Sequence, residues 1–452
     1  MKRNGSFSVL MAIMLFGFGQ KMFADYPIAS HRFLADPGAM VYNGRVYLYC
    51  SNDDDNPMDA KGGYWMRSIV CISSSDLKNW TDHGVVFEVP RDAEWAERSW
   101  APSPVEREGK FFLYYGNSGN GIGVAVADNP LGPFKDPLGK ELIEINTPGV
   151  LPAQHMWLFD TMAFIDYDGK AYLYFGGNGD DNVRVIKLNE DMISVDGPAI
   201  KLSALYFFEA AWMHKHNNKY YFSYSTQPRA QMRIDYMLSD KPASEFSYGG
   251  VVSMQPPENN NNNQAISQLN GEWYQAYHNR YVAREAGIPP GYKRNICVDH
   301  FTHNTEGTID TMKNTLDGLP QLYLVNPYER IEAEMFNAQK GIETTPCTAG
   351  GMELCELENG DYIRVRGVDF GKGAKKFEAS LASEIAEGEI EIRLDSLTGP
   401  FAGSLQVKNT GNLNEWKIQS DKIHKITGVH DVYFVFKGPG DDLFRFDWWR
   451  FS

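Results

Sequence analysis

The 452-residue sequence has little cysteine, and its cysteines are not spaced to bind a metal. The five thiols are Cys50, Cys71, Cys297, Cys347 and Cys355, and none belongs to a CxxC pair or a Cys/His cluster. This spacing excludes the common zinc motifs. Cys50 and Cys71 stand in apolar strand-like segments and are predicted to be buried thiols, whereas Cys347 and Cys355 could form a disulfide in an oxidising compartment.

No apolar run is long enough to cross a membrane. Residues 7–17 are apolar, but this stretch is shorter than the roughly 20 residues that a helical span needs. Met1-Lys2-Arg3 precedes the stretch and Ala24 follows it, a pattern typical of a signal peptide. We expect a signal peptide over residues 1–24 and export to the periplasm or the outside of the cell. No cysteine stands at the expected cleavage site, so a lipid anchor is not expected.

Positive charge is also scarce. The formal net charge is −15 and the pI is near 5.2, so the chain has no basic stripe for a phosphate backbone. This excludes nucleic acid as an expected partner and favours neutral ligands or cations. Aromatic residues make up 13% of the chain, and their flat apolar faces with polar edges suit stacking against sugar rings.

The aromatic residues concentrate in five similar segments, each beginning at a turn and continuing as an aromatic strand. The segments are residues 43–49, 109–115, 169–175, 218–224 and 271–277. Turn residues followed by such strands predict β-hairpins. The turn residues 44, 109, 169, 218 and 271 are 65, 60, 49 and 53 residues apart, at or above the period of propeller blades. Five copies predict a five-bladed β-propeller; unrelated hairpins in a sandwich are the alternative.

The pattern changes after Leu322. Alternating strand-like segments follow at residues 361–365, 389–394, 432–437 and 443–451, and their spacing favours a β-sandwich. We therefore predict an all-β chain with a signal peptide over 1–24, a propeller domain over 25–325 and a sandwich module over 326–452.

Three acidic residues precede predicted hairpin strands. Asp36 stands before Pro-Gly, Asp160 opens the third hairpin, and Glu209 lies in an aromatic setting before the fourth. Taken alone, an aspartate before Pro-Gly is more often a turn residue than a catalytic one. The acidic run at residues 52–56 lacks the offsets of a calcium loop and is predicted to be a solvated loop.

Five motifs occur in order along these blades, and together they resemble glycoside hydrolase family 43 over residues 28–322. They are Ala35-Asp36-Pro37, Trp100-Ala101-Pro102, Asp160 six residues before Asp166-Tyr167-Asp168-Gly169, Glu209 before Lys219-Tyr220-Tyr221, and Tyr277-His278-Asn279-Arg280 with Arg294 and Asp299 beyond. The remainder is similar to a carbohydrate-binding module of family 6.

The resemblance implies that Asp36 is the general base, Glu209 the general acid, and Asp160 the residue that tunes and orients the acid. Inversion at a glycosidic bond needs such a pair, one carboxylate for water and one protonated acid for the leaving oxygen. Burial and a nearby Asp160 would raise the pKa of Glu209.

Four further residues are predicted to bind substrate: Trp100, His278, Arg294 and Gln264. His278 could line the pocket or cap a strand. Gln264 stands where many relatives have a histidine, and a neutral amide offers a hard cation one oxygen only, which weakens the case for a central calcium.

In the sandwich module, the resemblance implies a structural calcium on Glu332, Glu334 and Asp447, because carboxylate oxygens suit that ion. The usual sugar cleft is altered: Tyr362 supplies one aromatic residue, the loop at 410–416 lacks the second, and Arg445 stands where asparagine is usual. The module is therefore expected to stabilise the enzyme or to shape the rim of its active site, rather than to bind glycan in that cleft.

Together these features predict an exported, inverting exo-glycosidase without an organic cofactor, acting on an oligo- or polysaccharide. An α-L-arabinofuranosidase is the first expectation, followed by a β-xylosidase and then a β-galactofuranosidase or exo-galactanase. Retaining fructosidases carry a Trp-Met-Asn-Asp-Pro motif that is absent around Asp36. A catalytically silent glycan-binding protein is the alternative outside the enzymes.

Overall fold

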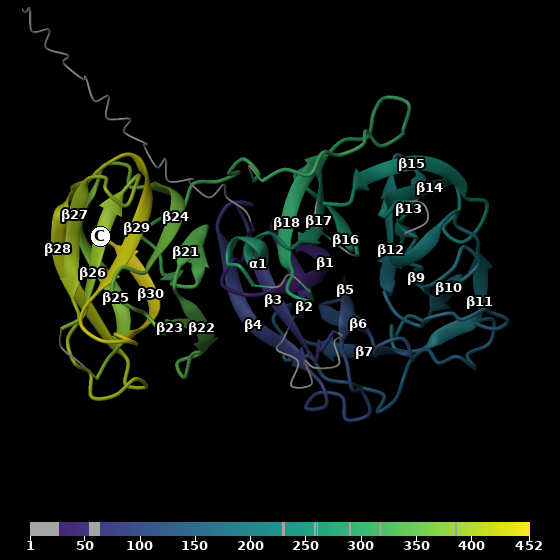
Figure 1. The fold of residues 1–452 in the computed structure, drawn as a ribbon, viewed down its shortest axis with the longest axis horizontal. Helices are drawn as coiled ribbons and strands as arrows, with labels where there is room; N and C mark the ends of the chain where they lie inside the picture. Colours follow the sequence, from purple (N-terminus) through teal and green to yellow (C-terminus); the bar gives the residue numbers. More distant parts are fainter. Residues whose placement is uncertain are drawn as a thin grey trace, which may run out of the picture.

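The computed structural model describes residues 27–53, 64–227, 231–256, 259, 261–288, 291–316, 318–384 and 387–452. It consists of two β domains side by side, with the C-terminus in the smaller one (Figure 1). The described part of the chain has one short helix, α1 (Tyr281–Glu285), and no helix there is long and apolar enough to span a bilayer. The expected signal peptide lies outside the described residues.

The larger domain is built from five antiparallel sheets, and each begins with a predicted hairpin. The sheets contain β1 (Leu34–Tyr42), β2 (Arg45–Asn52), β3 (Ser68–Ser74) and β4 (Trp80–Glu88); β5 (Trp100–Arg107), β6 (Lys110–Gly116) and β7 (Ile122–Ala127); β8 (Met162–Ile165), β9 (Ala171–Phe175), β10 (Val183–Leu188) and β11 (Val195–Leu202); β12 (Phe207–His216), β13 (Lys219–Thr226), β14 (Arg233–Ser239) and β15 (Ser247–Met254); and β16 (Gln264–Leu269), β17 (Glu272–Asn279) and β18 (Asn295–Phe301).

The turns explain why these hairpins form. Asn43-Gly44, Glu108-Gly109, Asn217-Asn218 and Asn270-Gly271 all have positive φ at both positions, the backbone geometry that matches the twist of two paired strands. The aromatic strands that follow bury their side chains between neighbouring sheets. Local turn chemistry and strand composition therefore specify the repeating unit.

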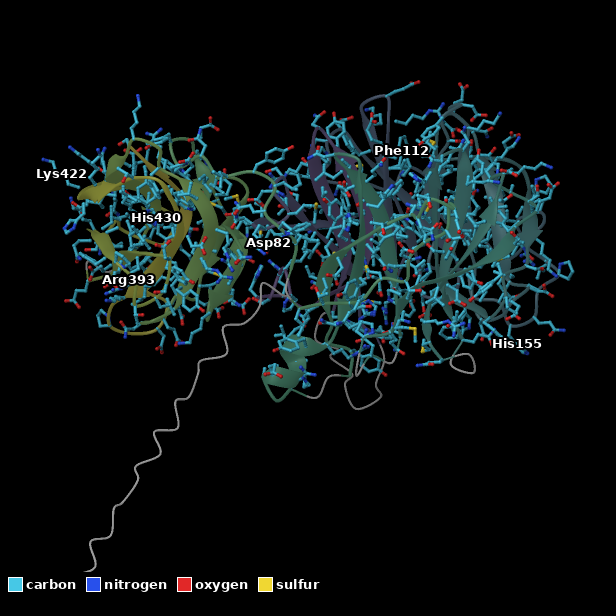
Figure 2. The ribbon with its side chains drawn as sticks, turned by 90° about the horizontal axis from the view of Figure 1, so that it is seen from above. Asp82, Phe112, His155, Arg393, Lys422 and His430 are labelled. Atoms are coloured by element: carbon cyan, nitrogen blue, oxygen red, sulfur yellow. The ribbon has the colours of Figure 1, made fainter. Side chains whose placement is uncertain are left out.

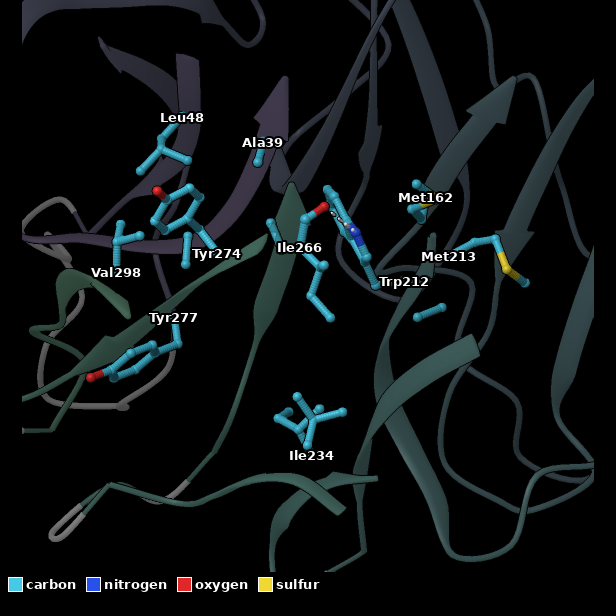
Figure 3. Close-up of a cluster of buried hydrophobic side chains, with 14 of the residues drawn as sticks. Ala39, Leu48, Met162, Trp212, Met213, Ile234, Ile266, Tyr274, Tyr277 and Val298 are labelled. Atoms are coloured by element: carbon cyan, nitrogen blue, oxygen red, sulfur yellow. Dashed lines mark hydrogen bonds between the residues drawn. The ribbon is translucent and has the colours of Figure 1, made fainter. Parts of the chain in front are cut away.

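The first strands of the five sheets form a ring. β1 contacts β5, β5 contacts β8, β8 contacts β12, β12 contacts β16, and β16 returns to β1. Figure 3 shows one such junction, where the Trp212 indole Nε1 donates to the Ile266 carbonyl at 2.9 Å and joins blades 4 and 5. The predicted five-bladed propeller is confirmed.

The smaller domain is a sandwich of two sheets, as predicted. One sheet contains β21 (Ala338–Lys340), β24 (Tyr362–Asp369), β29 (Val429–Lys437), β26 (Glu389–Leu394) and β27 (Phe401–Gln406); the other contains β22 (Glu343–Pro346), β23 (Met352–Cys355), β30 (Arg445–Phe451), β25 (Ala374–Ala382) and β28 (Lys417–Ile426), with β19 (Ile331–Glu332) paired to β30. The boundary at residue 325 stays a prediction.

The two domains share a sheet. β20 (Met335–Phe336) leaves the sandwich and pairs with β4, so it is the outer strand of blade 1. Beside it, the buried Asp82 carboxylate accepts from Arg32 Nε at 2.6 Å and Thr344 Oγ1 at 2.7 Å, and His31 Nε2 lies 2.9 Å away. Figure 2 shows Asp82 where the domains meet.

All five cysteines are free and buried. The disulfide considered for Cys347 and Cys355 does not form, because the register of the β22–β23 hairpin pairs Glu343 with Cys355 and Pro346 with Met352. Cys347 thus stands at the turn and Cys355 at the open end. Cys50 and Cys71 are buried thiols, as predicted.

Candidate active site

The propeller axis holds a small pocket to which all five blades contribute. Asp36 and Asp160 line it, together with Pro37, Ala101, Pro102, Thr161, Ala210, Ala211, Trp212, Asn263 and Gln264. Glu209 adjoins Ala210 in the chain, and its carboxyl is close enough to Asp160 and Asp36 for their charges to raise its pKa. The three acids proposed for catalysis therefore meet at one place.

Unusual backbone geometry aims these residues at the axis. Asp36, Ala101 and Ala210 have φ of 47°, 44° and 59°, and each lies where the strand register shifts. Asp160, two residues before β8, has φ of 47°. Such positive φ values are strained for residues other than glycine and occur where a bulge turns a side chain toward a functional site.

A buried arginine holds Asp36. Arg294 Nη1 donates to Asp36 Oδ1 at 2.6 Å, and His278 supports the same residue, because its Nδ1 accepts the Asp36 backbone N–H at 3.3 Å. Burial, and after it the charges of Arg294 and Arg280, lower the pKa of His278 well below its usual value, so the imidazole is neutral. An arginine partner stabilises the charged form of a carboxylate, and a carboxylate can accept a proton from water.

Asp53 fixes Arg294 from the other side. Arg294 Nε donates to Asp53 Oδ2 at 3.0 Å and Nη2 donates to Oδ1 at 2.8 Å, a bidentate pair with both side chains 1% exposed. Burial raises the pKa of Asp53 to about 6, against the lowering effect of Arg294. The prediction of a solvated loop is wrong for Asp53; the rest of that run, from residue 54, lies outside the described residues.

Asp160 and Glu209 form the acidic pair. Burial, followed by the charge of Asp36, raises the pKa of Asp160 to about 8. Burial, and then Asp160 and Asp36, raise the pKa of Glu209 well above its usual value. Asp160 Oδ2 accepts the Ala210 backbone N–H at 2.9 Å, whereas the Glu209 carboxyl has no hydrogen-bond partner among the described residues. The arrangement thus favours a protonated Glu209 that is free to donate to a ligand.

The arrangement can support acid–base cleavage, and comparison with known proteins identifies the family. Residues 25–309 match the glycosyl hydrolases family 43, and residues 332–452 match the carbohydrate-binding module of family 6. The chain belongs to glycoside hydrolase family 43. It is therefore a glycoside hydrolase.

Its relatives include arabinose-releasing enzymes. The chain is 39% identical to an arabinoxylan arabinofuranohydrolase of Paenibacillus polymyxa, covering 94% of this chain and 74% of the relative. The crystal structure of the Bacillus subtilis arabinoxylan arabinofuranohydrolase with cellotetraose superposes with a TM-score of 0.89 at 38% identity, covering 95% and 98%. An α-L-arabinofuranosidase of Clostridium thermocellum is 57% identical over 65% of this chain and 98% of that chain, with a TM-score of 0.57. β-Xylosidases occur among the relatives at 30% identity.

The other predicted family 43 site residues occupy different positions around the pocket. Gln264 lines it; its Nε2 donates to Ser223 Oγ at 2.7 Å and its Oε1 accepts from Gln275 at 3.3 Å. Trp100 is half-buried at the start of β5, whereas Arg294 and His278 are buried behind Asp36. In this arrangement, Arg294 and His278 position the proposed base, and direct contact with substrate stays a prediction.

Tyr64 was not predicted from the sequence. Its ring lies 4.4 Å from the Arg294 guanidinium, its hydroxyl accepts from Arg280 at 3.3 Å, and its edge meets Trp100 at 6.3 Å between centroids. Tyr64 therefore connects Arg294, which holds Asp36, to Trp100, which is predicted to bind substrate. No local motif marks this tyrosine, because its partners come from blades 2 and 5.

Two of the three residues predicted to bind calcium in the sandwich, Glu332 and Asp447, lie beside Arg330, and the calcium site itself stays a prediction. Arg330 binds Glu332 through Nε and Nη2 at 2.9 and 2.8 Å, and its Nη2 lies 3.3 Å from Asp447 Oδ1. Burial raises the pKa of Glu334 well above its usual value, and the charges of Glu332, Asp82 and Asp447 act in the same direction. Among the described residues, no three His, Cys, Asp or Glu side chains are grouped to hold a metal.

Proposed function

We propose that this chain is an exported, inverting α-L-arabinofuranosidase that removes arabinofuranosyl groups from arabinoxylan. The arrangement that carries the proposal is the meeting of the acids at the propeller axis, with Asp36 held by Arg294 and Glu209 kept protonated by burial and by the neighbouring carboxyls. The arabinofuranohydrolases among the relatives support the choice of sugar and polymer.

In the proposed reaction, the Asp36 carboxylate accepts a proton from a water molecule as that oxygen attacks the anomeric carbon. The bond from this carbon to the leaving oxygen breaks on the opposite face, and Glu209 gives its proton to that oxygen. The products are the free sugar, with inverted configuration, and the shortened polysaccharide. Proton exchange with solvent then restores a charged Asp36 and a protonated Glu209.

The pocket's surroundings support removal of a terminal residue. The Trp157 ring, 38% exposed, packs against Phe159 at 5.4 Å and Phe208 at 5.6 Å between centroids, directly beside the proposed acids in the chain. An exposed aromatic face packed against the chain neighbours of Asp160 and Glu209 suits a polymer backbone that lies outside the small pocket while one side group enters it.

A substrate panel tests the proposal. Aryl α-L-arabinofuranoside, β-D-xyloside and β-D-galactofuranoside are offered to the full chain, and NMR follows the anomer that is first released from the cleaved substrate. We expect the arabinofuranoside to be hydrolysed fastest, with release of the inverted anomer. Faster xyloside hydrolysis would select the β-xylosidase alternative, and a retained anomer would overturn the base assignment of Asp36.

Export belongs to the same proposal. We infer that residues 1–24 are removed, because a charged start and a short apolar run precede Ala24. Mass spectrometry of the protein from its native host should give a chain beginning near Asp25.

A further inference from the structure

A hollow of about 490 Å³ lies at the junction between the propeller and the sandwich, and the catalytic chemistry does not use it. It is lined by Leu324, Val325, Asn326, Tyr328, Asp369, Phe370, Gly371, Lys372 and Gly373. We call this set the junction hollow. Its volume falls within the range of about 300–1,000 Å³ that small-molecule sites occupy.

The walls of the junction hollow are held by hydrogen bonds. Val325 N donates to Gly367 O and Asp369 N donates to Val325 O, both at 2.9 Å, so the connecting segment lies along β24. The Tyr328 hydroxyl donates to Phe370 O at 2.7 Å and holds the ring against the opposite wall. The shape therefore exists before any ligand arrives, which lowers the entropy cost of binding.

The lining combines flat apolar surface with hydrogen-bonding groups. Leu324 is 53% and Tyr328 43% exposed, high values for side chains of this kind in a folded domain. Asn326, Asp369 and Lys372 supply an amide, a carboxylate and an ammonium group beside them. An aromatic ring next to a few polar groups is the surface that binds the apolar face and the hydroxyls of a sugar ring.

The charge of the lining favours a neutral ligand. Asp369 and Lys372 are the charged residues of the lining and carry opposite signs, in a protein of formal net charge −15. An anion would face an acidic protein with one compensating lysine, and a cation would need more than one carboxylate. Hydroxyl groups can donate to Asp369 and accept from Lys372 together.

The junction hollow is distinct from the module's usual sugar cleft. Tyr362, the cleft residue, begins β24, and Asp369 of the hollow ends it. Seven steps along a strand separate these residues by roughly 23 Å. The two places are therefore at opposite ends of the sandwich.

The exposed surface continues onto the propeller. Tyr323, 54% exposed, precedes Leu324, and its hydroxyl accepts from Asn270 Nδ2 at 2.8 Å in the blade 5 hairpin turn. Exposed tyrosine and leucine side chains thus follow one another across the domain junction. An extended chain fits such a strip better than a single sugar does.

We propose that the junction hollow and Tyr323 bind a neutral polysaccharide chain, and the choice of xylan as this chain rests on the proposed function. The site holds the polymer at the junction of the domains, on a surface separate from the catalytic pocket. It gives the module a glycan-binding surface in place of its altered cleft.

Affinity electrophoresis of the full chain through gels with soluble unsubstituted xylan tests this proposal. The parent carries Glu209→Gln so that cleavage during the run is slowed. Tyr328→Ala should weaken retention about three- to tenfold, the effect of removing one aromatic contact. Tyr167→Ala, which removes a 78% exposed tyrosine from blade 3, is the matched control and should leave retention unchanged. Equal retention of Tyr328→Ala and its parent would overturn the proposal.

Two further arms separate the outcomes. If Tyr328→Ala lowers the unfolding temperature, Leu324→Ser replaces it as the test variant, because it changes an exposed side chain. Leu324→Ser should also weaken retention in xylan. Retention in polygalacturonate but not in xylan would overturn the neutral-ligand assignment. The third measurement uses the chain with Glu209 restored and tests its activity on aryl arabinofuranosides. If this chain is inactive but its retention by xylan still depends on Tyr328, the proposed function is refuted and the proposed binding site is kept.

Discussion

At the scale of single residues, the pocket separates three carboxyls by their surroundings. One is paired with arginine, one accepts a backbone N–H, and one has no hydrogen-bond partner in the described part of the chain. Burial acts on all of them, so the differences come from these specific partners. Substitutions that change one partner should therefore change one step of the reaction.

Glu209→Gln should lower kcat on oligosaccharides by about 10²–10⁴-fold, the usual contribution of a general acid. Aryl substrates with good leaving groups need less protonation, so their kcat should fall much less. Steady-state rates on both substrate types measure the difference. An equal loss on both would show that Glu209 is not the proton donor.

Asp160→Asn should stabilise the protein at alkaline pH while lowering its activity. The folded-state pKa of Asp160 is raised to about 8, so folding gains from its protonated form at low pH and loses that gain between about pH 4 and 8. The uncharged amide avoids this loss. The unfolding temperature should rise by a few degrees at pH 8 and stay near that of the wild type below pH 4. A fall at pH 8 would contradict the raised pKa.

Asp53→Asn tests the support behind Asp36. Arg294 keeps a partner in Asp36 but loses the bidentate anchor, so kcat should fall about tenfold or more through misplacement of the base. KM on aryl substrates should change little. A change in KM without a change in kcat would show that Asp53 does not position the base.

At the scale of elements, the sheet shared by the two domains contributes to the stability of the fold. β20 covers the outer edge of blade 1, an edge that would otherwise present unpaired backbone groups. The Asp82 cluster beside it joins side chains from both domains.

Arg32→Met should destabilise the protein by about 3 kcal/mol, because the buried Asp82 then lacks its cationic partner. The Arg32 guanidinium and the His31 hydrogen bond hold the pKa of Asp82 below its usual range despite burial, so the contribution is present above pH 4 and is lost only in stronger acid. Denaturant unfolding at pH 7 measures it. Lys110→Ala, which breaks an exposed pair with Asp128, is the control and should have no measurable effect.

At the scale of the whole molecule, the sandwich completes the propeller. A chain ending at residue 329 would lack β20 and Thr344, which exposes the edge of β4 and removes a partner of Asp82. We expect this fragment to aggregate or unfold at a lower temperature than the full chain. Calorimetry and size-exclusion chromatography compare the two. A fragment as stable as the full chain would show that the shared sheet contributes nothing.

The sequence by itself determined the repeating unit, the five blades and the order of the proposed acids. Turn pairs such as Asn43-Gly44 and the aromatic strands after them act on neighbours in the chain, so their pattern is visible without coordinates. The order of the motifs was sufficient to indicate the family, which the comparisons confirm.

Only the tertiary structure decided which charged groups face one another. Asp53 and Arg294 are 241 positions apart, and their pairing, like that of Arg330 with Asp447, depends on elements that meet only in the folded chain. A run of acidic residues has the same local pattern whether it is solvated or paired with a buried arginine. The free energy of a buried charge depends on partners brought close by closure of the ring, and sequence spacing does not encode that closure.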